Sequence, residues 1–201
     1  KYDADKIFIL DIPALDQDFI DKLNTSVIYI DHHPPLKLVN LKMFNPRLKS
    51  RENITCVSSL AYEIAGMPEN LWLAALGTVA DWQINKKIMT QFTKKYPGIL
   101  HRMSANPGKL MFDSKLGQLI RIFIFALKGN YKDVMENVDA IKKITSPLAF
   151  FDDNEKSLHV LKKRCSNMQK EYDSLLSYAL NCVKDSPILF VKFGSVKVSF
   201  T

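Results

Sequence analysis

The chain has 201 residues, of which 47% are hydrophobic and 24% charged, a composition that suits one well-packed core and excludes global disorder. No apolar run is long enough to cross a bilayer, and no charged-then-apolar leader opens the sequence, so we expect a cytoplasmic protein. Three widely spaced cysteines argue against a disulfide framework or a zinc knuckle. The net charge of +7 favours polyanionic partners such as nucleic acid.

The first fifty residues predict strands that alternate with a helix. The run 6–10 (KIFIL) is compact and apolar and predicts a strand, and the β-branched and aromatic run 27–30 (VIYI) is typical of a buried strand. Residues 16–23 between them carry apolar side chains at helical spacing and are long enough for a parallel crossover. Residues 38–44 alternate weakly and end at an Asn-Pro turn, so we expect a third strand.

Helices dominate the sequence from residue 56 onward. Gly66 and Gly129-Asn130 supply stop signals, and Asp113-Ser114 supplies a start signal. An apolar helix with Gly77 inside it is hydrophobic nearly all round, which indicates burial and close packing. The predicted helices are 56–65 (capped by Thr55), 69–80, 114–127 and 156–183, with others between 86 and 145. Two last strands, 188–193 and 196–200, are expected to form a hairpin.

These elements predict an α/β fold that is helical in the middle. We expect a parallel-sheet domain at 1–150, a long connecting helix at 151–185 and the start of a small β-containing second domain at 186–201. The chain begins just before a predicted central strand and stops as the last sheet begins. Both ends are therefore expected to be cut.

Acidic and imidazole side chains follow three of the predicted elements. Asp11 follows the first strand, Asp31-His32-His33 follow the second, and Asp81 ends the apolar helix. Since the carboxyl ends of parallel strands meet at one edge of a sheet, the carboxylates of Asp11 and Asp31 should emerge together. A carboxylate opposes the helix dipole at the end of a helix unless a cation offsets its charge. Each aspartate alone is an ordinary turn or cap residue, but together with the histidine pair they predict metal or phosphate chemistry.

The ordered motifs ILDIP, IDHH, FNP, CVSSLAYEIAG and GTVAD resemble those of the DHH phosphoesterase superfamily, and the RecJ-like nucleases give the closest pattern. The resemblance covers about residues 5–82. It implies a parallel-sheet DHH domain and a metal-dependent exonuclease that acts on single-stranded DNA or RNA in replication or repair. Replication or repair proteins would be its protein partners.

The resemblance also implies roles for individual residues. The family binds two divalent ions, usually Mn²⁺, with Mg²⁺ as the alternative. Asp11 would bridge both ions, and His32 and Asp81 would bind the second ion. Asp31 would hold the ligating histidine in place, and His33 would face the scissile phosphate. This set suits the chemistry because two ions close together activate a shared water and clamp a phosphate, and mixed His and Asp ligands suit manganese.

Two departures from the family pattern limit the resemblance. The family's first motif, a histidine and two aspartates on an upstream strand, does not precede the ILD strand. Residues 2–5 (YDAD) lie directly against that strand, where no crossover helix fits, so we interpret them as a loop. The glycine-rich C-terminal motif is also missing. The sequence therefore predicts a fragment or a degenerate member that holds at most one ion.

A loop and several aromatic side chains are candidates for contact with nucleic acid. Arg47, Lys49 and Arg51 follow the Asn-Pro turn and are the basic residues nearest to the histidine pair, so contact with a phosphate backbone is weighed against a solvated loop. Trp82 has two interpretations, stacking on a base and core packing. The paired serines of CVSSL have two as well, phosphate binding and helix capping. Phe44, Tyr62 and Trp72 are expected in the core.

The favoured hypothesis is a metal-dependent phosphodiesterase that hydrolyses single-stranded nucleic acid. Two alternatives stay open. The missing first motif favours a catalytically inactive scaffold of the same fold that binds replication proteins. The same site would also fit a hydrolase of short oligonucleotides or cyclic dinucleotides.

Overall fold

The structure is a computed structural model that describes residues 3–183 and 190–194. The chain divides into two compact units, Lys1–Leu110 and Met111–Thr201. This division differs from the predicted domains at 1–150, 151–185 and 186–201, which stay a prediction. Within the described ranges, every helix is too short or too polar to cross a membrane.

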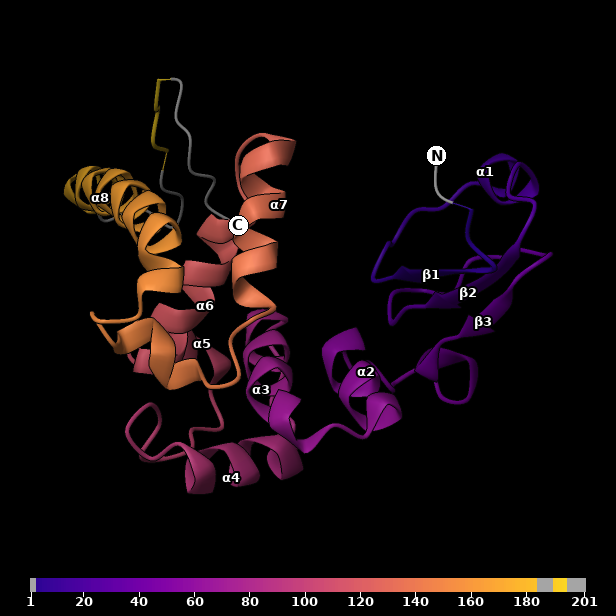
Figure 1. Cartoon of the computed structure of the whole chain (residues 1–201), viewed down its shortest axis with the longest axis horizontal. Coiled ribbons are helices and arrows are strands. Elements are labelled where there is room, and N and C mark those ends of the chain that lie inside the picture. The colour runs from indigo at the N-terminus through magenta and orange to yellow at the C-terminus, as the bar shows by residue number, and fades with distance from the viewer. Residues whose placement is uncertain (1–2, 184–189, 195–201) are drawn as a thin grey trace. The chain divides into compact units, whose positions relative to one another are not determined.

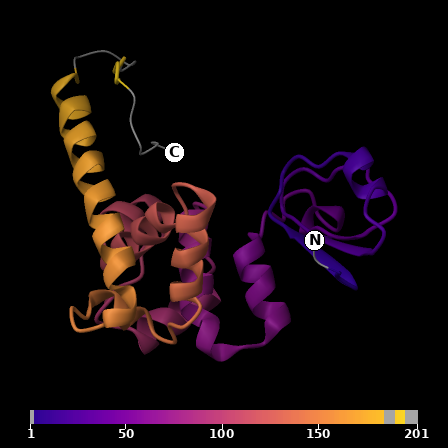
Figure 2. The same cartoon turned by 45° about the horizontal axis from the view of Figure 1, so that its top comes forward.

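A three-stranded parallel sheet opens the first unit, as predicted, and makes the fold mixed α/β. Its elements are β1 (Lys6–Leu10), α1 (Gln17–Asp21), β2 (Ser26–Ile30) and β3 (Lys42–Phe44), with strand order β1-β2-β3. Figure 1 shows the three labelled strands side by side, and Figure 2 gives a second view of the same chain. The register pairs Leu10 with Ile30 and Ile30 with Phe44, so all three strands end at the same edge.

The third strand is shorter than the predicted 38–44. Val39 donates its N–H to the Gln17 side chain, 2.9 Å away, and Asn40 adopts a left-handed backbone with φ 61° while its side chain bonds Asp21. Both residues are thus tied to α1 rather than to the strand ladder. The prediction that Phe44 belongs to the core is wrong, since 54% of this side chain is exposed.

The rest of the first unit is helical, and α2 packs against α3. The elements are α2 (Val57–Ala65), the 3₁₀ turn η2 (Pro68–Asn70), α3 (Leu71–Ala80), α4 (Lys86–Lys95) and, across the unit boundary, α5 (Pro107–Phe112). Cys56, not Thr55, occupies the cap position of α2, and Gly66 ends that helix in the left-handed conformation. As predicted, α3 is buried nearly all round, with Trp72 only 1% exposed.

The second unit is helical. It contains α6 (Lys115–Ala126), α7 (Tyr131–Ile141), the 3₁₀ segments η3 (Pro147–Phe151) and η4 (Lys156–Leu158), and α8 (His159–Asn181). Ser114 caps α6 by accepting the Gly117 N–H, and the predicted long helix is α8. Arg164 ties α8 to α7 through Asp133 and Glu136, each 3.0 Å away. The predicted hairpin falls largely outside the described residues, and residues 190–194 form no strand.

A substitution at Gly77 tests how closely α2 and α3 approach each other. A Cβ at this position would lie 2.1 Å from Ser58 Oγ and 2.5 Å from Ser58 Cβ. We expect Gly77→Ala to lower the free energy of unfolding by about 1 to 2 kcal/mol, because overpacking outweighs the gain in helix propensity. Chemical denaturation measures the change.

Two variants control this prediction. Gly98 has no heavy atom within 4 Å of an added Cβ, so Gly98→Ala should leave stability unchanged. Ser58→Gly removes both clashing atoms, so it should cost less in the Gly77→Ala background than alone. A Gly77→Ala variant as stable as the unchanged protein would contradict the close approach.

Cys165 on α8 links stability to alkaline pH. Burial raises the pKa of its thiol from 9.0 to about 11. The folded state keeps a proton that the unfolded chain releases, so this group destabilises the fold as pH rises from about 9 to 11. Chemical denaturation across that window should show a shallower loss of stability for Cys165→Ala. Cys182→Ala, at the end of the same helix, is the control, and equal slopes for both variants would refute the assignment.

Candidate metal centre

Backbone pairing brings the predicted ligands to one edge of the sheet. The Asp11 N–H donates to Ile30 O over 3.0 Å, and the Asp31 N–H donates to Phe44 O over 3.1 Å. The ladder therefore extends one residue beyond each strand and ends there. Asp11 and Asp31 emerge at the same edge, as predicted, with His32 directly after the point where the pairing stops.

Two left-handed residues flank this edge. Asp11 has φ 59° and Trp82, the neighbour of Asp81, has φ 55°. This conformation is uncommon for aspartate and unfavourable for a bulky residue such as tryptophan. Strained backbone of this kind persists where the surrounding structure holds it and is concentrated at functional sites.

His32 stands between the two predicted carboxylate ligands. Its Nε2 lies 3.4 Å from Asp11 Oδ1 and 3.5 Å from Asp81 Oδ2. Its Nδ1 lies 3.2 Å from Ile54 O. Because a carbonyl only accepts, Nδ1 is the donor in that bond, and in the neutral ring Nε2 carries the lone pair.

The buried Nε2 atom of His32 has no hydrogen-bond partner among the described residues. A lone pair that faces two carboxylates is unfavourable unless something positive lies between them. Nitrogen and oxygen ligands lie about 2.0 to 2.2 Å from a divalent ion, which places neighbouring ligands about 3 to 3.5 Å apart. The distances from His32 Nε2 to Asp11 and to Asp81 are therefore compatible with a cation that His32 shares with either carboxylate.

His33 also belongs to this cluster. Ligand atoms of Asp11, His32 and His33 lie within 4.8 Å of one another, and Asp81 joins the cluster through its contact with His32. The family resemblance gave His33 the phosphate-facing role instead. The geometry places it close enough to the cluster for either role.

Asp31 holds a different histidine from the one expected. It was expected to hold the ligating His32, yet its Oδ1 lies 2.8 Å from His33 Nδ1 and its Oδ2 accepts the His33 N–H. A buried aspartate two residues before a backbone N–H forms this compact turn readily. The Ile54 carbonyl fixes Nδ1 of His32, just as Asp31 fixes Nδ1 of His33.

The Asn-Pro turn braces the backbone of the histidine pair. Asn45 Nδ2 donates to His33 O over 2.9 Å, and Arg47 Nε donates to His32 O over 2.8 Å. Asn45 also accepts the Arg47 N–H. Arg47 is thus half-buried beside the site, whereas Lys49 and Arg51 are exposed on the stretch after η1 (Pro46–Leu48).

Gln83 is a site residue that sequence analysis missed. Its Nε2 donates to Asp81 Oδ2 over 2.9 Å and to Ile54 O over 2.6 Å, while its Oε1 accepts the Cys56 N–H. One amide thus ties the end of α3 to the segment before α2. Nothing in the sequence pairs residue 83 with residues 54 and 56, so no local pattern signals this role.

Electrostatics at Asp81 agree with a site suited to a cation. Partial burial raises the pKa of this carboxyl above its ordinary value. His32 lowers it by a smaller effect, the negative charge of Asp11 raises it, and His33 lowers it. Burial first, and then the negative charge of Asp11, make the anionic form of Asp81 costly, and a bound cation would relieve that cost.

The remaining candidates lie elsewhere or serve packing. Trp82 is 58% exposed, so the core-packing interpretation is wrong for this residue. Ser59 is buried and bonds Thr78 over 2.9 Å, so its hydroxyl serves the contact between α2 and α3. No family model matches this chain, and no curated protein matches it significantly.

Metal binding at this centre is testable through stability. A ligand that binds only the folded state stabilises it by about 2.7 kcal/mol at one hundred times its Kd. We expect MnCl2 to raise the melting temperature of the chain and His32→Ala to abolish that shift. His101, an exposed histidine, gives the matched control His101→Ala, which should keep the full shift. An undiminished shift in His32→Ala would rule out this centre.

Proposed function

We propose that this chain is a metal-dependent phosphodiesterase of the DHH type that hydrolyses single-stranded DNA or RNA. The observation that supports it best is the buried, unpartnered Nε2 of His32 facing Asp11 and Asp81 at the carboxyl edge of a parallel sheet. Edges of this kind are where open α/β folds bind their ligands. The ordered DHH motifs supply the reaction class.

Asp11, His32 and Asp81 would hold the cation, with Mn²⁺ proposed and Mg²⁺ as the alternative. A divalent ion held here would supply an activated water and offset the charge of a phosphodiester. The Ile54 carbonyl fixes the His32 ring, and Gln83 fixes Asp81. Because ligand positions are set by these contacts, the cluster is preorganised.

His33 would contact the substrate. Its Nδ1 is fixed by the buried Asp31, so Nε2 is the nitrogen left to meet a phosphate oxygen. The His33 side chain is 37% exposed, compared with 9% for His32. The more accessible of the two rings therefore suits the phosphate, and the more buried one suits the ion.

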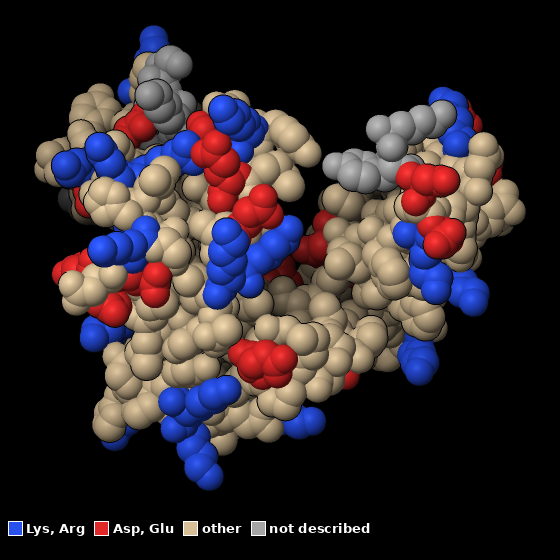
Figure 3. Space-filling view, in the orientation of Figure 1, with Lys and Arg blue, Asp and Glu red and all other residues tan. Residues whose placement is uncertain are grey.

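Basic residues near the centre support a polyanionic substrate. Arg47 is anchored on His32 O, and Lys49 and Arg51 follow it at the surface. On the face that Figure 3 shows, lysine and arginine side chains are scattered among acidic ones rather than gathered in one track. The basic residues that support contact with a single strand are therefore the ones in this loop of the first unit.

Hydrolysis is the direct test. With MnCl2, the chain should cleave end-labelled single-stranded DNA or RNA. His32→Ala and Asp81→Asn should each lower the rate by at least about 100-fold, since even the loss of a partner that only orients a metal ligand costs about 10- to 100-fold, while His101→Ala should retain it. Substrates of decreasing length, including dinucleotides and cyclic dinucleotides, identify the preferred class. A chain that binds Mn²⁺ but cleaves none of these would refute the phosphodiesterase and favour the scaffold that binds replication proteins.

A contact between the basic loop and the phosphate backbone predicts salt-dependent binding. Lys49→Gln should weaken the binding of a fluorescent single-stranded oligonucleotide and reduce the slope of affinity against salt by about one unit. Lys94→Gln changes an equally exposed lysine on α4 and is the matched control. Fluorescence anisotropy across a salt series measures both. Equal effects of the two variants would mean that the loop makes no specific contact.

A further inference from the structure

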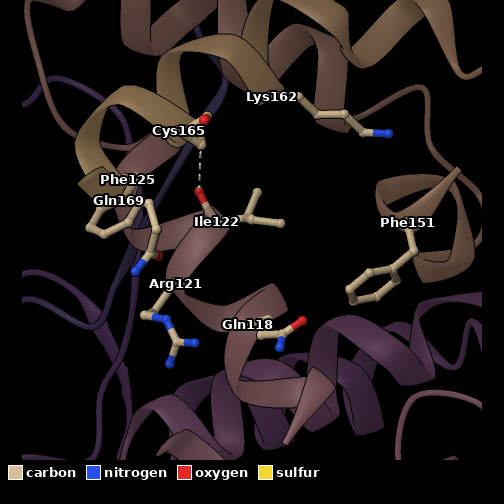
Figure 4. A pocket seen from close by; sticks show the side chains of 9 residues that line it. Gln118, Arg121, Ile122, Phe125, Phe151, Lys162, Cys165 and Gln169 are labelled. Carbon is tan, nitrogen blue, oxygen red and sulfur yellow. Dashed lines mark hydrogen bonds between the residues drawn. The ribbon is translucent and has the colours of Figure 1, made fainter. Parts of the chain in front are cut away.

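A second candidate site lies in the helical unit. An open cavity of about 500 Å³ lies between α6, α8 and η3, and every residue that lines it belongs to Met111–Thr201. Figure 4 shows these side chains arranged around the opening. A volume of about 300 to 1,000 Å³ is typical of pockets for small organic ligands.

One face of α6 forms the first wall. It presents Gln118, Arg121, Ile122 and Phe125, which follow the i, i+3, i+4, i+7 spacing of a single helical face. Polar groups thus lie toward one end of the stripe and the Phe125 ring lies at the other. Such a wall offers both a surface for an apolar body and donors for a polar group.

The facing wall repeats this spacing on α8. Lys162, Cys165, Ser166 and Gln169 line it, again at i, i+3, i+4 and i+7. The two walls meet where the Cys165 thiol donates to Ile122 O over 3.5 Å, the dashed line in Figure 4. Beyond that contact the helices leave the cavity between them.

Arg121 is the residue of this pocket whose hydrogen-bond donors the fold does not fully satisfy. Its Nη1 donates to Met111 O over 3.2 Å, while its buried Nε has no hydrogen-bond partner among the described residues. An unpaired, buried Nε donor on a half-buried arginine costs free energy that a carboxylate or phosphate would recover. The cavity lining contains no aspartate or glutamate to do so.

The rim adds an aromatic ring and further positive charge. Phe151 of η3 lines the cavity, and Lys115 Nζ lies 5.9 Å from the centre of its ring. Lys162 also lines the cavity, and its Nζ donates to Asp152 O. The pocket is therefore apolar in its walls and cationic at several points.

We propose that this pocket binds a small organic anion with a planar ring. The ring would pack against Phe125, Ile122 and Phe151, and the anionic group would meet Arg121. A nucleoside monophosphate and an aromatic carboxylate share this chemistry. The proposal is independent of the phosphodiesterase, since no residue of the metal centre takes part.

Binding is measured on the 201-residue chain by ¹H–¹⁵N NMR titration with four separate probes. Adenosine monophosphate and 1-naphthoate carry both a ring and a charge, inorganic phosphate lacks the ring, and 1-naphthylmethanol lacks the charge. We expect saturable shifts of amides in 118–125 and 162–169 with at least one of the first two probes. Which of them binds identifies the ligand class. Absence of saturable shifts with both, or shifts confined to other residues, overturns the proposal.

Variants then test the charged groups. Arg121→Gln and Lys162→Gln should each weaken binding by about tenfold, as the loss of a charge-assisted hydrogen bond does. Lys163→Gln alters the exposed neighbour of Lys162 outside the lining and should leave affinity unchanged. NMR spectra of the free variants report whether they stay folded. Equal weakening by Lys163→Gln, or equal affinity for the uncharged naphthyl probe or for phosphate alone, would refute the ring-bearing anion.

Discussion

The parallel pairing of β1 with β2 is the constraint on which the candidate centre depends. Its last bond, from Asp11 N to Ile30 O, fixes where the chain leaves the ladder. Because side chains alternate between the faces of a strand, a slip of one residue would turn Asp11 away from His32. The register is set by buried side chains such as Val27 and Tyr29, far more apolar than the site itself. Packing in the sheet thus positions a polar cluster whose two carboxylates, Asp11 and Asp81, repel each other.

The third ligand depends on a different kind of packing. Asp81 ends α3, a helix whose burial leaves it little freedom to move. Close contact of Gly77 with Ser58 and the buried bond between Ser59 and Thr78 lock α3 to α2. Gln83 then joins the end of α3 to the Ile54 carbonyl, which also holds His32. The same carbonyl therefore sets both the histidine ring and, through Gln83, the carboxylate opposite it.

Local patterns in the sequence were enough to predict the strands, the buried helix and the emergence of Asp11 and Asp31 at one edge, because each follows from periodicity and from parallel topology; the grouping of Asp11 with His32 came from the family resemblance. Such patterns could not predict contacts between segments that are distant in the sequence. The shortening of β3 comes from bonds of Val39 to α1, and the role of Gln83 comes from bonds across almost thirty residues. Asp31 was assigned to the wrong histidine because two adjacent rings are equivalent in a sequence. Their difference appears only when backbone geometry decides which ring a fixed carboxylate can reach.

The His32 and His33 rings differ in how exposed they are to solvent. In both, Nδ1 is fixed by an oxygen, from Ile54 for His32 and from Asp31 for His33, so in both Nε2 faces outward from its anchor. The Nε2 of His32 is buried beside two carboxylates and has no hydrogen-bond partner among the described residues, a setting in which a cation can satisfy it. His33 is far more accessible, so a ligand can reach it without displacing the protein. Under the proposed function, two neighbouring, similarly anchored histidines would serve an ion and its substrate separately, because their exposure to solvent differs.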